Sequence, residues 1–173
     1  MPPDLAGSLV VEDRQYALQE LSALVMSWLA SLSTPTLNPP DTCGLSGAWR
    51  SPAEWALLAG EAGLEATPVV FDSASEQALG PYPWYAWGPH APFVEDVVVV
   101  GNVVFAGVEL ARPVVDACRR LAALSATPLL GVAFADGGTS PVIGITPLPD
   151  LRAGGEAMIA ALAEALAGER GGG

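Results

Sequence analysis

A cysteine, a histidine and an aspartate are the residues of this chain that could support nucleophilic catalysis. Cys43 could attack an electrophilic carbon after His90, the chain's single histidine, takes its proton, and Asp96 or Asp41 could orient the imidazole. No local motif predicts that these residues meet, so the simpler interpretation is a loop cysteine and an unrelated surface histidine. Ser46 in GLSG lacks the preceding strand that a nucleophile elbow requires.

The segment GPYPWYAWGPHAP, residues 80–92, combines aromatic side chains with proline. Its candidate interface residues are Tyr82, Trp84, Tyr85 and Trp87. Because proline disfavours a regular helix or a central strand, one interpretation is a stiff loop that folds over a sheet. The other is a protein interface, since Trp and Tyr bury large areas and keep a polar group available. Ligand stacking is less favoured, because no cationic or convergent polar residues accompany the rings.

Apolar periodicity predicts the helices that position these groups. The first begins at Asp13, which is expected to cap it. Its apolar positions, three and four residues apart, are Leu18, Leu21, Val25, Trp28 and Leu32. A second helix runs from the side-chain cap Ser51 to Gly63, a third has Pro113 in its first turn, and a fourth spans about 153–167.

Runs of β-branched residues bounded by turn formers predict the strands. One strand is expected at 66–71, and a hairpin is expected around the Gly101-Asn102 turn in VEDVVVVGNVVFAGVEL. A second hairpin joins 128–135 to 141–146 through DGGTS. The first hairpin does not alternate cleanly between apolar and polar residues, so both of its faces are expected to be covered.

This order of elements predicts an α+β fold with a mixed, mainly antiparallel sheet of hairpins flanked by about four helices. The chain's 173 residues are enough for one compact core. We expect a flexible N-terminus at 1–12, a single α+β domain at 13–168 and a disordered tail at 169–173.

Three phrases occur in an order and spacing that resemble a known superfamily. They are TLNPPDTCGLSGAWRSPAEWALLAGEAGLEATPVVF, DVVVVGNVVFAGVEL and LAALSATPLLGVAFADGGTSPVIGITPLPDL. Together they resemble the C-terminal part of ATP-grasp domains, particularly those of ribosomal-protein glutamate ligases and peptide-macrocyclising ligases. The resemblance implies lysines that neutralise nucleotide phosphates, and acids plus an amide that hold magnesium.

The positions that match the family's ligand residues are changed in this sequence. Ala133 stands where a metal-binding Asp is expected, and Gly144 and Thr146 stand where Glu and Asn are expected. The hairpin's Asp-x-Arg keeps Asp96 but has Val98 in place of Arg. The chain contains no lysine. The interval between the strand expected at 66–71 and the hairpin strand that begins at Val97 is too short for the family's lid subdomain. The resemblance therefore implies a degenerate, shortened relative that holds no metal and no cofactor.

Composition limits the partners. The net charge of -12 predicts repulsion from nucleic acids and anionic membranes. Two cysteines without zinc-site spacing, and a beginning without a secretion signal, favour a cytoplasmic location. Because 51% of residues are hydrophobic, some apolar surface is expected to meet a protein partner or a second copy.

We therefore expect a non-catalytic interaction or structural subunit, an ATP-grasp-like pseudoenzyme in a homo- or hetero-oligomeric complex. Two alternatives remain open. One is a small enzyme or ligand-binding protein of an unrelated α/β kind, which uses Cys43 and His90 or a pocket beneath the aromatic segment. The other is a regulator that binds and tunes an intact ligase.

Overall fold

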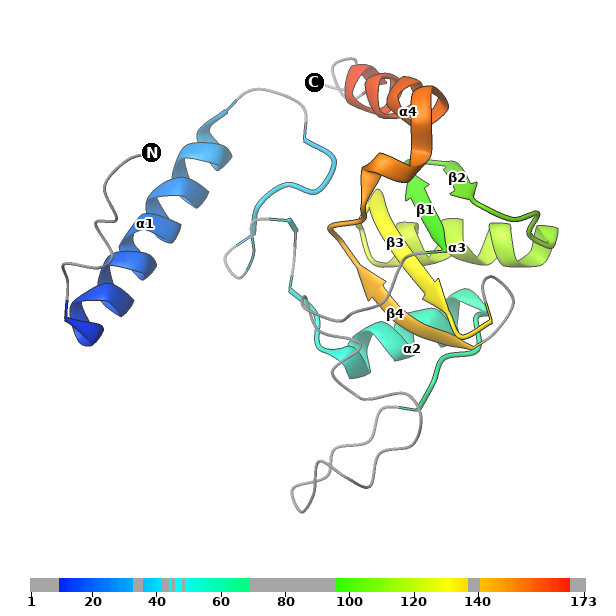
Figure 1. Cartoon of the computed structure of the whole chain (residues 1–173), viewed down its shortest axis with the longest axis horizontal. Helices are drawn as coiled ribbons and strands as arrows, with labels where there is room; N and C mark the ends of the chain where they lie inside the picture. Colours follow the sequence, from blue (N-terminus) through cyan, green and yellow to red (C-terminus); the bar gives the residue numbers. More distant parts are fainter. Residues whose placement is uncertain are drawn as a thin grey trace.

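The computed structural model describes residues 10–32, 36–41, 44, 46–47, 49–68, 96–136 and 141–168. Within them, four α-helices and a four-stranded antiparallel sheet confirm the predicted α+β class (Figure 1). The elements are α1 (Val11–Ser31), α2 (Pro52–Ala62), β1 (Val97–Val100), β2 (Val103–Ala106), α3 (Arg112–Leu124), β3 (Leu129–Phe134), β4 (Val142–Thr146), the 3-10 helix η3 (Leu151–Gly154) and α4 (Gly155–Gly168). The predicted tail at 169–173 and most of the predicted flexible N-terminus lie outside the described residues.

The strands lie in the order β2-β1-β3-β4, and all neighbouring pairs are antiparallel. The predicted turn joins β1 to β2, and Gly101 there has a positive φ of 57°, a value that glycine adopts without strain. In the second hairpin Ala133 pairs with Gly144, and the register shifts between Ala133 and Phe134. Both predicted hairpins are thus confirmed.

The strand predicted at 66–71 is not confirmed as a full strand. Among the described residues it is reduced to a parallel bridge between Ala66 and Val142. The Val142 N–H donates to the Glu65 carbonyl at 2.7 Å, and the Thr67 N–H donates to the Val142 carbonyl at 2.9 Å. Residues 69–71 lie outside the described part of the chain, so the rest of this prediction is untested.

Of the first hairpin, β1 is covered on both faces as expected, whereas β2 is not: its residues are exposed or half-buried. Helices α2 and α3 pack against one face, where Trp55 and Leu121 meet Val97, Val99 and other buried side chains (Figure 1). On the opposite face α4 contributes Met158 to a smaller cluster with the alternate β1 residues, Val98 and Val100. Successive side chains of a strand point to opposite faces, and both faces of β1 are covered, so all four β1 residues are buried.

The ends of α2 follow local chemistry. The Ser51 hydroxyl accepts a hydrogen bond from the Glu54 N–H, and the Glu54 carboxylate accepts one from the Ser51 N–H at 2.7 Å. The hydrogen bonds that the Ser51 N–H and the Ser51 hydroxyl donate to this carboxylate lower the pKa of Glu54. Gly63 ends the helix with a φ of 88°. The prediction for α1 was wrong in one respect: the helix begins at Val11, so Asp13 lies inside its first turn and does not cap it.

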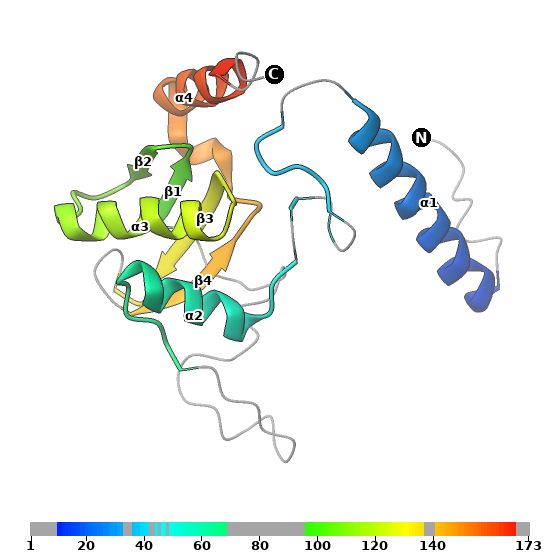
Figure 2. The same ribbon diagram turned by 180° about the vertical axis from the view of Figure 1, so that it is seen from behind.

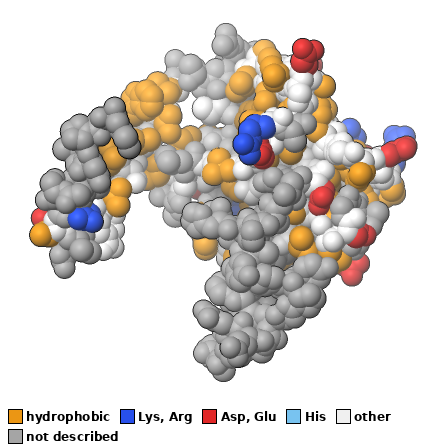
Figure 3. Space-filling view, viewed as in Figure 1, with side chains coloured by type: hydrophobic (Ala, Val, Ile, Leu, Met, Phe, Trp, Pro, Cys, Tyr) orange, Lys and Arg blue, Asp and Glu red, His pale blue; other side chains and the backbone are white. Residues whose placement is uncertain are grey.

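Helix α1 extends away from the sheet and the other helices in both views (Figure 1, Figure 2). A connection through residues 36–41 leads from it to α2. Hydrophobic side chains gather over the upper end of α1 (Figure 3). Among the described residues, no helix has the length and apolarity needed to cross a membrane.

Candidate functional site

The strand pair β3–β4 is where the family resemblance places metal ligands. Ala133 lies directly opposite Gly144, and Gly131 lies directly opposite Thr146, on the face of the sheet that points away from α2 and α3. Ala133 has no exposed surface, and Gly144 is also buried. The structure therefore brings the predicted positions together, but a single hydroxyl is the only polar side-chain group among these four residues. That Thr146 hydroxyl accepts a hydrogen bond from the Leu148 N–H at 3.1 Å.

Asp96, which the sequence suggested as an acid of a reactive set, is bound to the backbone of β3. Its carboxylate accepts a hydrogen bond from the Phe134 N–H at 2.7 Å, and its own N–H donates to the Val132 carbonyl at 3.0 Å. Asp96 immediately precedes β1, so the hydrogen bond between its carboxylate and the Phe134 N–H adds one more link between β1 and β3. This position gives the aspartate a structural role in pairing β1 with β3.

The remaining members of the proposed reactive set, Cys43 and His90, lie outside the described residues. The second cysteine, Cys118, is buried in the core between α3 and the sheet. Burial raises the pKa of its thiol to about 11, so it stays protonated at neutral pH. The described part of the chain contains no group of three or more His, Cys, Asp or Glu side chains that could hold a metal ion.

Three of the described arginines, Arg50, Arg119 and Arg120, donate to backbone carbonyls, whereas Arg112 and Arg152 pair with the carboxylates of Asp116 and Asp150. The sequence favours a role for Arg119 and Arg120 at the C-terminal dipole of their own helix, and the structure differs. Arg120 donates through Nε and Nη2 to the Ala62 carbonyl at 3.0 and 2.7 Å, so it caps the C-terminus of α2 instead. Arg119 donates through Nε to the Asn102 carbonyl at 2.8 Å in the hairpin turn.

Arg50 has a similar fastening role. Its Nη2 donates to the Ser125 carbonyl at 2.7 Å, just beyond α3, and its guanidinium lies 5.3 Å from the centre of the Trp55 ring. The sequence shows that cationic residues are few, but it could not show that Arg50, Arg119 and Arg120 bind backbone carbonyls.

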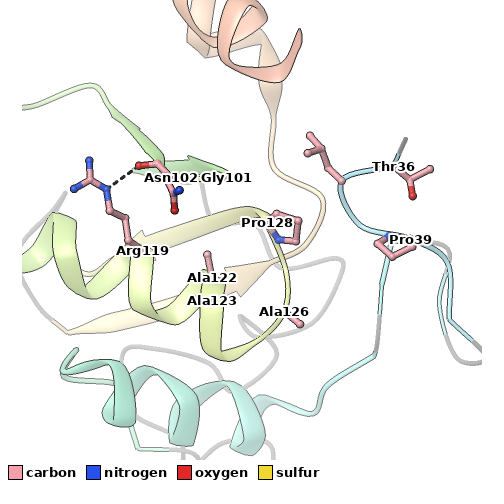
Figure 4. Close-up of a pocket in the computed structure, with 10 residues that line it drawn as sticks. Thr36, Pro39, Gly101, Asn102, Arg119, Ala122, Ala123, Ala126 and Pro128 are labelled. Atoms are coloured by element: carbon pink, nitrogen blue, oxygen red, sulfur yellow. Dashed lines mark hydrogen bonds between the residues drawn. The ribbon is translucent and has the colours of Figure 1, made fainter. Parts of the chain in front are cut away.

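An open cleft of about 510 Å³ lies between residues 36–39, α3 and the β1–β2 turn (Figure 4). Alanine and proline contribute half of its lining, at Pro39, Ala122, Ala123, Ala126 and Pro128. Arg119 is its one ionisable lining residue, and its guanidinium is already hydrogen-bonded to the Asn102 carbonyl (Figure 4). Thr36 and Asn102 are its other polar lining residues, and its lining residues include no acid, histidine or cysteine.

The other predicted ligand pocket, beneath the aromatic segment, cannot be placed. Its residues Tyr82, Trp84, Tyr85 and Trp87 lie outside the described part of the chain, as do the remaining residues of 80–92. Whether these rings form a loop packed on the sheet or a protein interface therefore stays a prediction.

Sequence reasoning missed the role of Asn38. Its side-chain amide donates to the Leu129 carbonyl at 2.8 Å and to the Pro147 carbonyl at 2.9 Å, and its Oδ1 accepts from the Leu129 N–H at 3.1 Å. Asn38 thus binds the connection after α1 to the start of β3 and to the residue after β4. The Asn-Pro-Pro sequence was a visible signal, but nothing local indicates partners 91 and 109 residues away.

Comparisons of this chain with protein-family models, with curated proteins and with solved structures found no match.

Proposed function

We propose that this chain is a non-catalytic interaction subunit, an ATP-grasp-like pseudoenzyme that acts in a homo- or hetero-oligomeric complex. The observation that carries the proposal is the pairing of Ala133 with Gly144 on β3–β4, where the resemblance requires magnesium ligands. Phosphoryl transfer depends on cations that neutralise the charge of the nucleotide phosphates. The β3–β4 pair offers no carboxylate ligand for magnesium at these positions, and the chain has no lysine to neutralise the nucleotide phosphates.

The use of the described cations supports the same proposal. Arg50, Arg119 and Arg120 each donate to a backbone carbonyl, and so contribute to the packing of helices and turns. Asp96, the acid that the resemblance retains, is likewise bound to the backbone N–H of Phe134. These three arginines and Asp96 therefore contribute to the packing of the fold.

Exposed apolar surface supports an interaction role. Single exposed hydrophobic residues are common on any protein, so the isolated examples Leu57 and Leu148 carry little weight. Helix α1 is different, because several large hydrophobic side chains are exposed along one element. Such a surface costs solubility unless a partner covers it.

The proposal predicts that the purified protein does not bind Mg-ATP. Calorimetric titration should give no saturable heat, and the melting temperature should not change with nucleotide. Any ligand present at 100 times its dissociation constant would add about 2.7 kcal/mol to the free energy of unfolding, so binding would be visible as a shift. Saturable binding or turnover of ATP would overturn the proposal.

The interaction role is tested separately by the mass of the native complex. Light scattering of protein purified from its own host should give a mass above 17.7 kDa, and mass spectrometry should identify the components at fixed stoichiometry. A monomer without any companion over the whole concentration range would contradict the interaction role.

A further inference from the structure

Helix α1 carries a regular apolar stripe that the described body of the protein leaves open. Its positions alternate by three and four residues, which places Leu18, Leu21, Val25 and Trp28 on one side of α1, and Leu32, the residue after the helix, continues the spacing. Leu18, Leu21 and Trp28 are 63%, 56% and 57% exposed, Leu32 is 38% exposed, and Val25 is half-buried. Within the described residues, α1 makes no extensive contact with the sheet or with another helix.

We propose that α1 pairs with α1 of a second copy of this chain, as an antiparallel two-helix coiled coil. The proposal rests on the interaction role above and names its surface and its partner. Hydrophobic residues that repeat at three- and four-residue intervals insert between the side chains of a facing helix, so the stripe calls for a helical partner.

The stripe is self-complementary about residue 23. Leu21 and Val25 lie two residues on either side of that position, and Leu18 and Trp28 lie five residues on either side. With a two-fold axis at residue 23, Leu21 therefore lies opposite Val25 of the other copy, and Leu18 lies opposite Trp28. Each layer then combines a larger with a smaller or differently shaped side chain, which favours close packing.

The charge distribution favours the antiparallel arrangement. The charged residues of α1 all lie before its midpoint, at Glu12, Asp13, Arg14 and Glu20, and residues 21–32 carry none. A parallel pair would place these acidic halves side by side and would put Arg14 against Arg14 at the seam. In the antiparallel pair each acidic half lies beside the uncharged half of the other helix, where Arg14 meets Leu32 at the end of the stripe.

The size of the surface fits a self-associating pair. A helix of 21 residues is about 32 Å long. Burying five large apolar side chains on each helix removes on the order of 1,200 Å² in total, the lower end of the range for specific interfaces. We therefore expect reversible dimerisation, with a dissociation constant on the order of micromolar.

Analytical ultracentrifugation of the full chain over a concentration series tests the pairing. The mass should rise from 17.7 kDa towards 35.4 kDa, twice the monomer mass. Leu21→Glu places charge at the centre of the stripe and should weaken dimerisation at least tenfold. Ala23→Glu is the matched control, because it adds the same charge to the opposite, exposed side of α1 and should leave the mass unchanged. Circular dichroism should show equal helix content in both variants.

The orientation is tested with a spin label at Gln15→Cys in a Cys43→Ser background, since Cys118 is buried. In the antiparallel pair the two labelled positions are about 24 Å apart along the helix axes, and in a parallel pair they are side by side at about 10 Å. The longer distance is the expected result. The shorter one would overturn the antiparallel arrangement.

These outcomes separate the pairing from the proposed function. A wild-type chain that stays monomeric at about 100 µM, or equal masses for Leu21→Glu and Ala23→Glu, would overturn the pairing. If a different protein binds the chain and Leu21→Glu abolishes that binding, the interaction role stands while the self-pairing is wrong. Saturable Mg-ATP binding would overturn the proposed function regardless of the mass.

Discussion

Replacing Asn38 with alanine removes three hydrogen bonds that hold the connection after α1 against the sheet. The amide nitrogen loses the carbonyls of Leu129 and Pro147, and the amide oxygen loses the Leu129 N–H. Alanine leaves these three backbone groups without their partner, while the side chain of Asn38 is itself only half-buried. The change should therefore destabilise the fold without affecting the hydrophobic cores.

The magnitude follows from the number and the environment of the bonds. A typical hydrogen bond contributes about 1 kcal/mol net, and a backbone group left unpaired inside the protein costs about 1–3 kcal/mol. Partial burial allows water to replace some of the lost contacts. We therefore expect Asn38→Ala to lower the free energy of unfolding by about 2–3 kcal/mol, a large part of the roughly 5–15 kcal/mol of an ordinary domain.

Urea denaturation followed by tryptophan fluorescence measures this loss. The midpoint should fall while the dependence on denaturant stays unchanged, because the folded core remains intact. Asn102→Ala is the matched control, since the Asn102 side chain is exposed in the β1–β2 turn and should change stability by less than about 0.5 kcal/mol. A loss below about 0.5 kcal/mol for Asn38→Ala would refute the reasoning.

Three further predictions concern single side chains. Ala126→Gly should stabilise the protein by about 0.5 kcal/mol, because Ala126 has a φ of 49° that strains a residue with a Cβ; a lower melting temperature would contradict this. Cys118, whose pKa is about 11, should resist alkylation in the native protein and react only on unfolding; rapid native labelling, detected by mass spectrometry, would be the opposite result. Hydrogen bonds from Arg152 lower the pKa of Asp150 to about 2, so any stability from this pair is lost as the pH falls towards 2. Arg152→Gln should return the Asp150 pKa, measured by NMR titration, towards its ordinary value, and an unchanged pKa would refute the assignment.

Local chemistry made much of the fold predictable. Ser51 and Gly63 predicted both ends of α2, because a side-chain cap and a left-handed glycine act within a few residues. The Gly101-Asn102 turn predicted the first hairpin for the same reason. Asp13 was misassigned because the cap signal is equally compatible with the interior of a first turn, where an acid also interacts favourably with the helix dipole.

Predictions that depend on distant partners failed or could not be made. Within the described residues, the strand expected at 66–71 shows only a bridge between Ala66 and Val142, and its hydrogen bonds are made with Val142 in β4, far along the chain. Arg120 was expected to serve its own helix, but it binds the Ala62 carbonyl, 58 residues away. Neither partner can be read from neighbouring residues, since the chain meets them only after the hairpins and helices have packed.

The sequence by itself determined that the candidate ligand positions carry no acid, because Ala133, Gly144 and Thr146 offer the same small side chains in any fold. It also determined the heptad-like spacing of α1. Only the tertiary structure decided that Ala133 and Gly144 lie opposite each other, that the Asp96 carboxylate meets the Phe134 N–H, and that Leu18, Leu21 and Trp28 of α1 are exposed. The physical reason is that residue types set the chemistry available to a position, whereas long-range packing sets which groups are desolvated, paired or left exposed.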